Sequence, residues 1–169
     1  MSEFVKALLG NQGSSQIPEE YDWFAPLLGD WDFDYYDGEG LKKRHVEGEW
    51  IFRRVLDGAG IEDLFICPSR NTREDNPQPD GEYGAALRMF HPEKKVYEMV
   101  YTTRGYMTRL EVKKENGKIA CTRLDNPDEK WVFDELTGAS FHWRNITVQE
   151  NRVWKTNCEV FAVRKKSRD

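Results

Sequence analysis

This sequence has few of the residues that build metal sites or nucleophilic sites. Its three cysteines, Cys67, Cys121 and Cys158, lie far apart with no CxxC pair, and only three histidines occur in 169 residues. Zinc sites and disulfide frameworks need clustered cysteine and histidine, so we expect free thiols and no metal. The glycines occur singly rather than in a phosphate-binding loop. No cofactor is indicated.

A long apolar run and an excess of basic residues are also missing. No stretch approaches the roughly 20 apolar residues of a membrane-spanning helix, and residues 1–10 lack a signal-peptide pattern. The net charge is −5, and the dense basic stretch is confined to residues 164–168. Nucleic-acid binding needs a basic surface. These absences predict a cytoplasmic protein with neither a membrane nor a nucleic acid as partner.

What the sequence does contain is a regular alternation of apolar and polar residues from Gly29 onward, interrupted by turn signals. Alternation with a period of two is typical of strands, and this spacing of turns is typical of an all-β barrel or sandwich. We predict one up-and-down antiparallel β-barrel of about ten strands, at about 29–36, 45–56, 60–67, 82–91, 96–104, 105–115, 118–125, 130–136, 139–149 and 152–165.

Short helical segments are predicted before the barrel. Residues 1–17 form an N-terminal arm, in which Ser2 caps a short helix and a flexible linker follows. A second helical turn begins at Pro18 and ends at Gly29, and its apolar side chains could close one end of the barrel. Residues 18–169 then make up the barrel domain.

Turn chemistry also predicts which side chains face inward, because opposed residues of a hairpin share a face. The most reliable turn is Asn116-Gly117, a pair typical of type I′ turns. The predicted inner residues are Trp50, Phe52, Arg54, Ile61, Asp63, Phe65, Gly84, Ala86, Arg88, Phe90, Tyr97, Met99, Tyr101, Tyr106, Thr108, Leu110, Val112, Ile119, Cys121, Arg123, Val132, Asp134, Phe141, Trp143, Asn145, Trp154, Thr156, Cys158 and Arg164. The same argument places Trp131 and Phe133 outside with Leu87 and Met89, which suggests a homodimer.

Charged and aromatic side chains are mixed in this predicted interior. Buried charges are costly unless they are paired or solvated, so the mixture favours a wet cavity over a dry core. The candidate ligand-binding residues are Trp50, Phe52, Asp63, Arg88, Met99, Tyr101, Tyr106, Arg123 and Trp143. Residues 68–81 form the one long connection, which could act as a lid.

Several motifs carry a resemblance to a known superfamily. They are Leu28-Gly29-Asp30-Trp31, Trp50-x-Phe52-x-x-Val55-Leu56-Asp57-Gly58 and Ser140-Phe141-His142-Trp143-Arg144. With the strand pattern, they resemble the calycin superfamily of lipocalin and fatty-acid-binding barrels, and more specifically bacterial lipocalin-like domains of unknown function. The resemblance implies that Trp31 packs at the closed end beneath Arg164 of the last strand. It also implies that arginine and tyrosine can bind a carboxylate inside the barrel.

Three functions follow as hypotheses. The first is binding of a small amphipathic, hydrophobic molecule, which could be an acid held by Arg88, Arg123 and Tyr101. The second is a cofactor-free enzyme of the isomerase, cyclase or hydratase type, with Asp63 as the general acid or base beside a tyrosine or arginine. The third is a dimeric interaction module with a filled barrel.

Plainer roles for the same charged residues stay open. The two arginines could pair with Asp63 and Asp134, and Asp63 could pair with Arg54. Either pairing would make these groups structural.

Overall fold

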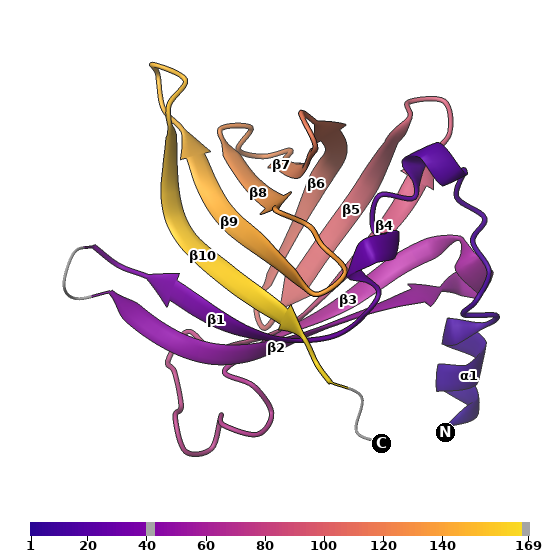
Figure 1. Ribbon diagram of the computed structural model, residues 1–169, viewed down its shortest axis with the longest axis horizontal. Coiled ribbons are helices and arrows are strands. Elements are labelled where there is room, and N and C mark those ends of the chain that lie inside the picture. Colours follow the sequence, from indigo (N-terminus) through magenta and orange to yellow (C-terminus); the bar gives the residue numbers. More distant parts are fainter. Residues whose placement is uncertain (40–42, 167–169) are drawn as a thin grey trace.

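Ten strands close into a barrel in which each strand pairs with its neighbours in sequence and β1 pairs with β10 (Figure 1). The computed structural model describes residues 1–39 and 43–166. The predicted all-β fold and its up-and-down order are confirmed. The elements are α1 (Glu3–Leu9), η1 (Glu19–Tyr21), η2 (Ala25–Leu27), β1 (Gly29–Asp37), β2 (Arg44–Val55), η4 (Leu56–Gly58), β3 (Gly60–Cys67), β4 (Glu82–His91), β5 (Val96–Thr103), β6 (Tyr106–Glu115), β7 (Lys118–Arg123), β8 (Glu129–Asp134), β9 (Ser140–Val148) and β10 (Trp154–Arg164).

Alternation along each strand builds the barrel as predicted. In β1, Trp31 and Phe33 are buried whereas Asp32 is exposed, so the two faces of the strand meet different environments. The β6–β7 hairpin turns at Asn116 and Gly117, whose φ angles of 50° and 76° are the left-handed values that an Asn-Gly turn provides. This turn fixes the register of the middle strands.

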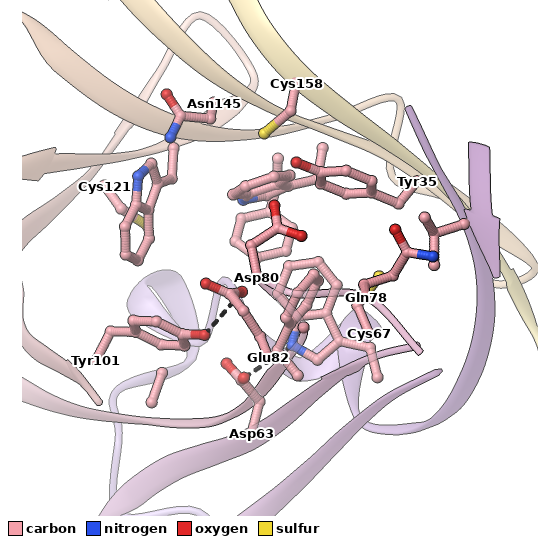
Figure 2. A pocket seen from close by; sticks show the side chains of 18 of the residues that line it. Tyr35, Asp63, Cys67, Gln78, Asp80, Glu82, Tyr101, Cys121, Asn145 and Cys158 are labelled. Carbon is pink, nitrogen blue, oxygen red and sulfur yellow. Dashed lines mark hydrogen bonds between the residues drawn. The ribbon is translucent and has the colours of Figure 1, made fainter. Parts of the chain in front are cut away.

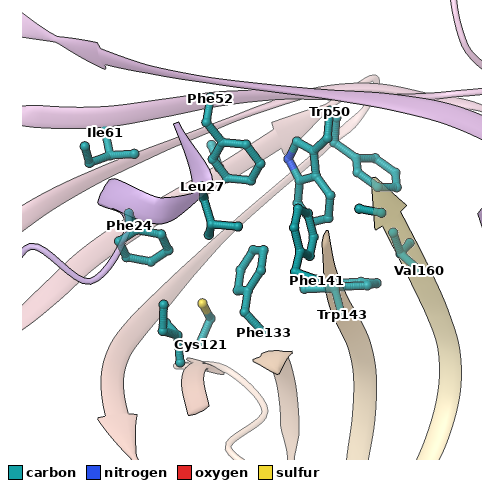
Figure 3. Close-up of a cluster of buried hydrophobic side chains, with 14 of the residues drawn as sticks. Phe24, Leu27, Trp50, Phe52, Ile61, Cys121, Phe133, Phe141, Trp143 and Val160 are labelled. Carbon is teal, nitrogen blue, oxygen red and sulfur yellow. The ribbon is translucent and has the colours of Figure 1, made fainter. Parts of the chain in front are cut away.

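The helical turns before β1 plug one end of the barrel. Phe24 and Leu27 are fully buried and pack beside Phe52 and Phe133, as Figure 3 shows. The plug is also held by a hydrogen bond, in which the Tyr97 hydroxyl donates to the carbonyl of Tyr21 at 2.6 Å. We call this the closed end.

Arg164, near the end of β10, ties the plug to the last strand. Its guanidinium carbon lies 4.2 Å from the centroid of the Trp31 ring. The same group donates hydrogen bonds of 2.7 to 2.8 Å to the carbonyls of Pro26, Leu28 and Gly138. The expected packing of Trp31 beneath Arg164 is therefore confirmed.

The predicted faces of β8 are wrong. Phe133 pairs with Trp143 in β9, which places Trp131 and Phe133 inside and Val132 and Asp134 outside. The reason is the connection between β8 and β9, which pairs odd-numbered residues with odd-numbered ones, whereas a two-residue turn at Thr137-Gly138 would have reversed the parity. A homodimer stays a prediction, but the outer surface proposed for it no longer includes Trp131 or Phe133.

A bulge changes the face of β10 partway along the strand. The register with β9 shifts between Thr156 and Cys158. Cys158 therefore faces inward as predicted, but Thr156 lies opposite Ile146 and shares the outer face with Trp154, contrary to prediction.

The N-terminal arm lies outside the barrel beside the closed end (Figure 1). The predicted cap is present, since the Ser2 hydroxyl accepts a hydrogen bond from the Val5 N–H at 3.3 Å. The Asn11 N–H donates to the Asp57 carboxylate at 3.0 Å, which fastens the arm to η4. The end of the predicted basic stretch, 167–168, lies outside the described residues.

We predict that Arg164→Ala lowers the free energy of unfolding by about 2 to 3 kcal/mol, because it removes a cation–π contact and three hydrogen bonds from one charged group. Urea unfolding followed by circular dichroism measures the change. Lys166→Ala, at an exposed neighbouring position, is the control. Equal stability of the two variants would contradict a closing role for Arg164.

Candidate functional site

A cavity of about 300 Å³ occupies the barrel between the aromatic core and the end opposite the plug, which we call the open end. Aromatic rings, three carboxylates, two guanidinium groups and three thiols line it. Figure 2 shows the carboxylates of Asp63, Asp80 and Glu82 and the three cysteine side chains around this space. The lining residues are Tyr35, Arg44, Val46, Trp50, Asp63, Phe65, Cys67, Gln78, Asp80, Gly81, Glu82, Ala86, Arg88, Met99, Tyr101, Cys121, Trp131, Phe133, Trp143, Asn145 and Cys158.

A buried ion pair forms the floor of this cavity. The Arg88 Nη1 donates to one Asp63 oxygen at 2.5 Å, and the Trp50 Nε1–H donates to the other at 2.8 Å. Both charged side chains are 1% exposed. The Arg88 guanidinium also lies 4.7 Å from the centroid of the Phe24 ring in the plug. Burial raises the pKa of Asp63, and its two donors oppose this rise.

The predicted pairing of Asp63 with Arg54 is wrong, because the register places Phe52 opposite Asp63. Arg54 lies nearer the closed end and pairs with Asp22 of the plug at 2.6 Å. The alternative in which Arg88 pairs with Asp63 is confirmed. Asp134 binds Lys118 on the outer face rather than either arginine.

Most of the predicted ligand-binding residues meet in the cavity. The six that line it are Trp50, Asp63, Arg88, Met99, Tyr101 and Trp143. Phe52 is fully buried in the core outside the lining. Tyr106 is 40% exposed, and Arg123 stacks over its ring while pairing with Asp125 and Glu129 at 2.8 and 2.7 Å. The predicted site residues Tyr106 and Arg123 therefore do not line the cavity.

A second carboxyl group, Glu82 at the start of β4, lies on the wall beside Tyr101. The Tyr101 hydroxyl donates to Glu82 at 3.1 Å (Figure 2). Burial raises the pKa of Glu82, and this hydrogen bond opposes the rise. A Cβ atom at position 84 would lie 2.2 Å from the Tyr101 oxygen, so Gly84 is what lets the phenol approach the strand.

The long connection 68–81 forms part of the wall at the open end. Arg44 of β2 holds it there by hydrogen bonds to Asp80 at 2.7 and 2.9 Å and to Gln78 at 3.3 Å. The same guanidinium binds Asp37 of β1 at 2.5 Å. Hydrogen bonds from Arg44 lower the pKa of Asp37 and of Asp80, so both stay ionised.

All three thiols face this cavity and are free. Burial raises the pKa of Cys67 and of Cys121 to about 12, and that of Cys158 to about 11. Since the thiolate is the nucleophile, these groups are poor nucleophiles near neutral pH.

Several lining residues were not among the predicted site residues. Tyr35 follows Trp31 and Phe33 on the inner face of β1, and Glu82 shares the inner face of β4 with Arg88. Extending the alternation along these strands would have found both. Asp80 belongs to an irregular connection, and no sequence pattern links it to Arg44.

Metal ligands do not cluster in the part of the chain that the structure describes: no group of three or more histidine, cysteine or acidic residues could hold a metal ion there. Within those same residues, no helix has the length and apolar character needed to cross a membrane.

No protein-family model matches this sequence, and a search of curated proteins finds no match.

We predict that Asp63→Asn lowers the free energy of unfolding by about 3 to 5 kcal/mol, because it leaves the Arg88 charge buried without its partner. Chemical denaturation measures this loss. Asp75→Asn, the same change at an exposed position, should alter stability by less than about 0.5 kcal/mol. The double variant Asp63→Leu/Arg88→Met should be more stable than Asp63→Asn; if it is not, the uncompensated charge is not the cause.

Thiol labelling provides a further prediction. At pH 8, Cys158 should react with iodoacetamide at least about 100-fold more slowly than a free cysteine, because its raised pKa leaves little thiolate. The rate should rise about tenfold per pH unit between pH 7 and 9, since this range lies below a pKa of about 11. Mass spectrometry of proteolytic peptides gives the rate at Cys158 itself, and a plateau near pH 8.5 would show an ordinary thiol.

Proposed function

We propose that this protein binds a small amphipathic, largely hydrophobic molecule in the barrel cavity. The observation that carries the proposal is a cavity of about 300 Å³ with aromatic walls and a few polar groups. Ligand sites in proteins start at about this size and combine apolar walls with a small number of placed polar groups. A barrel whose interior was filled by side chains would leave no such space.

The architecture supports the same proposal. A closed ten-strand antiparallel barrel, plugged by helical turns, with Arg164 over Trp31, is compatible with a lipocalin-like fold. We infer membership of the calycin superfamily from these features together. The inference about binding depends on the cavity itself rather than on this kinship.

The side chains of the cavity favour an acidic ligand less than other ligands, because both arginines are already paired. Arg88 is bound to Asp63, and Arg44 is bound to Asp37 and Asp80. A carboxylate would have to displace one of these carboxylates to gain an arginine. The acid therefore remains one member of the test panel rather than the expected ligand.

The cofactor-free enzyme is a second candidate, favoured by one observation. Glu82 has a raised pKa and accepts a hydrogen bond from Tyr101 inside the cavity, as a general acid or base would need. Asp63 suits that role less well because both of its oxygens are occupied. Incubation of a bound ligand with the protein, followed by NMR, distinguishes the candidates: a binding protein returns the ligand unchanged.

We predict that ligands alter the tryptophan fluorescence and that Ala86→Phe weakens their binding by at least about tenfold. Ala86 lines the cavity and is 1% exposed, so a phenyl ring there fills the space that the ligand needs. Titration of neutral, cationic and acidic aromatic compounds, read by the fluorescence of Trp50, Trp131 and Trp143, provides the measurement.

The matched control is Ala85→Phe, because Ala85 lies on the same strand and faces outward. It should leave affinity unchanged within about twofold. Circular dichroism and melting temperature establish that both variants are folded. The binding proposal fails if no compound in the panel changes the fluorescence, or if both substitutions weaken binding equally.

A further inference from the structure

The charges that line the cavity are unequally compensated. The lining contains three carboxyl groups and two guanidinium groups. They belong to Asp63, Asp80 and Glu82, and to Arg44 and Arg88. The Asp63–Arg88 pair neutralises itself at 2.5 Å, and Arg44 serves both Asp80 and Asp37. The lining therefore holds one more carboxyl group than guanidinium groups, and both guanidinium groups are already paired.

Glu82 is the carboxyl group that remains for a ligand. Within the described part of the chain, no basic side chain lies within 4.0 Å of it, and its hydrogen bond comes from the neutral Tyr101 hydroxyl. Only one of its two oxygens is engaged in that bond. A carboxylate in a partly buried site is stabilised strongly by a cation that approaches it.

Aromatic rings line the cavity beside Tyr101, the hydrogen-bond partner of this carboxyl group. The rings of Trp131 and Tyr101 are nearly perpendicular with centroids 5.2 Å apart, and the Trp131 centroid is 6.3 Å from that of Trp143. All three rings line the cavity. Indole and phenol rings attract cations through their electron-rich faces, most strongly where water is excluded.

We propose that the ligand is a cation: a hydrophobic amine whose ammonium group binds Glu82 beside Tyr101, with its apolar body against Trp131 and Trp143. This inference rests on the proposed function, because it names the chemical class of ligand for the same cavity. An ammonium group supplies the missing positive charge and donates to the unoccupied Glu82 oxygen. An acid in the same position would face Glu82 without a free arginine.

Three compounds that share one apolar body test the assignment: phenylbutylamine, phenylbutanol and phenylbutyric acid, each with the polar group at the chain end. Isothermal titration calorimetry at pH 7 measures their affinities for the full chain. The amine should bind at least about tenfold more tightly than the alcohol, and the acid most weakly, because only the amine gains a charge-assisted hydrogen bond.

Glu82→Gln separates the carboxylate from the shape of the cavity, since glutamine has almost the same size and no charge. It should reduce the preference for the amine over the alcohol to within about twofold, while affinity for the alcohol stays nearly constant. Glu74→Gln removes a charge at an exposed position on the long connection and should leave every affinity unchanged. The ranking of the three compounds on the unaltered protein tests the inference even if Glu82→Gln does not fold.

The two proposals fail in different ways. If the acid or the alcohol binds more tightly than the amine, the proposal that the ligand is a cation is overturned. The proposal that the cavity binds a ligand then still stands. An amine preference that survives in Glu82→Gln overturns the role of this carboxylate. If none of the three compounds binds and the wider panel also fails, the binding function itself is overturned.

Discussion

The ion pair between Asp63 and Arg88 is the contact on which the interior of this barrel depends. Removing two charges from water is costly, and here the cost is offset by close contact, by the Trp50 N–H and by the Phe24 ring. These partners come from β2, β3, β4 and the plug, so one charged cluster fixes the arrangement of three strands and of the segment that closes the barrel. It also occupies the arginine that would otherwise attract an anion.

The side chains inside the barrel differ between the closed-end side and the open-end side of this ion pair. Toward the plug, phenylalanine and tryptophan rings fill the space, and Trp50 contacts several of them. Toward the open end, β4 contributes Ala86, whose small side chain lines the cavity, and Gly84, which leaves room for the Tyr101 phenol. The hydrogen-bonded pair of Tyr101 and Glu82 also faces this space, where an apolar filling would leave the second Glu82 oxygen without a partner. The cavity therefore follows from small residues and a polar pair of side chains on one wall.

How much of this could be predicted depended on whether local rules fix the geometry. Alternation and turn chemistry gave all ten strands, and the Asn116-Gly117 turn gave the faces of the middle strands correctly. The predicted face of Phe133 was wrong because the connection between β8 and β9 is longer than a two-residue turn, which changes which residues pair. The predicted face of Thr156 was wrong because a bulge is not visible in the sequence. The link between Arg44 and the long connection depends on tertiary packing, which alternation cannot indicate.

The seam between β1 and β10 joins parts of the barrel that are far apart in the chain, with Trp31 opposite Arg164. Contacts between neighbouring hairpins close short loops, whereas this seam closes one that spans nearly the whole barrel, so it should form late in folding. Until the ribosome has released β10, β1 has an unpaired edge and Trp31 lacks its cover. An exposed edge of this kind can pair with another chain. The contact that seals the finished barrel therefore also ends the period in which the nascent chain is most prone to aggregate.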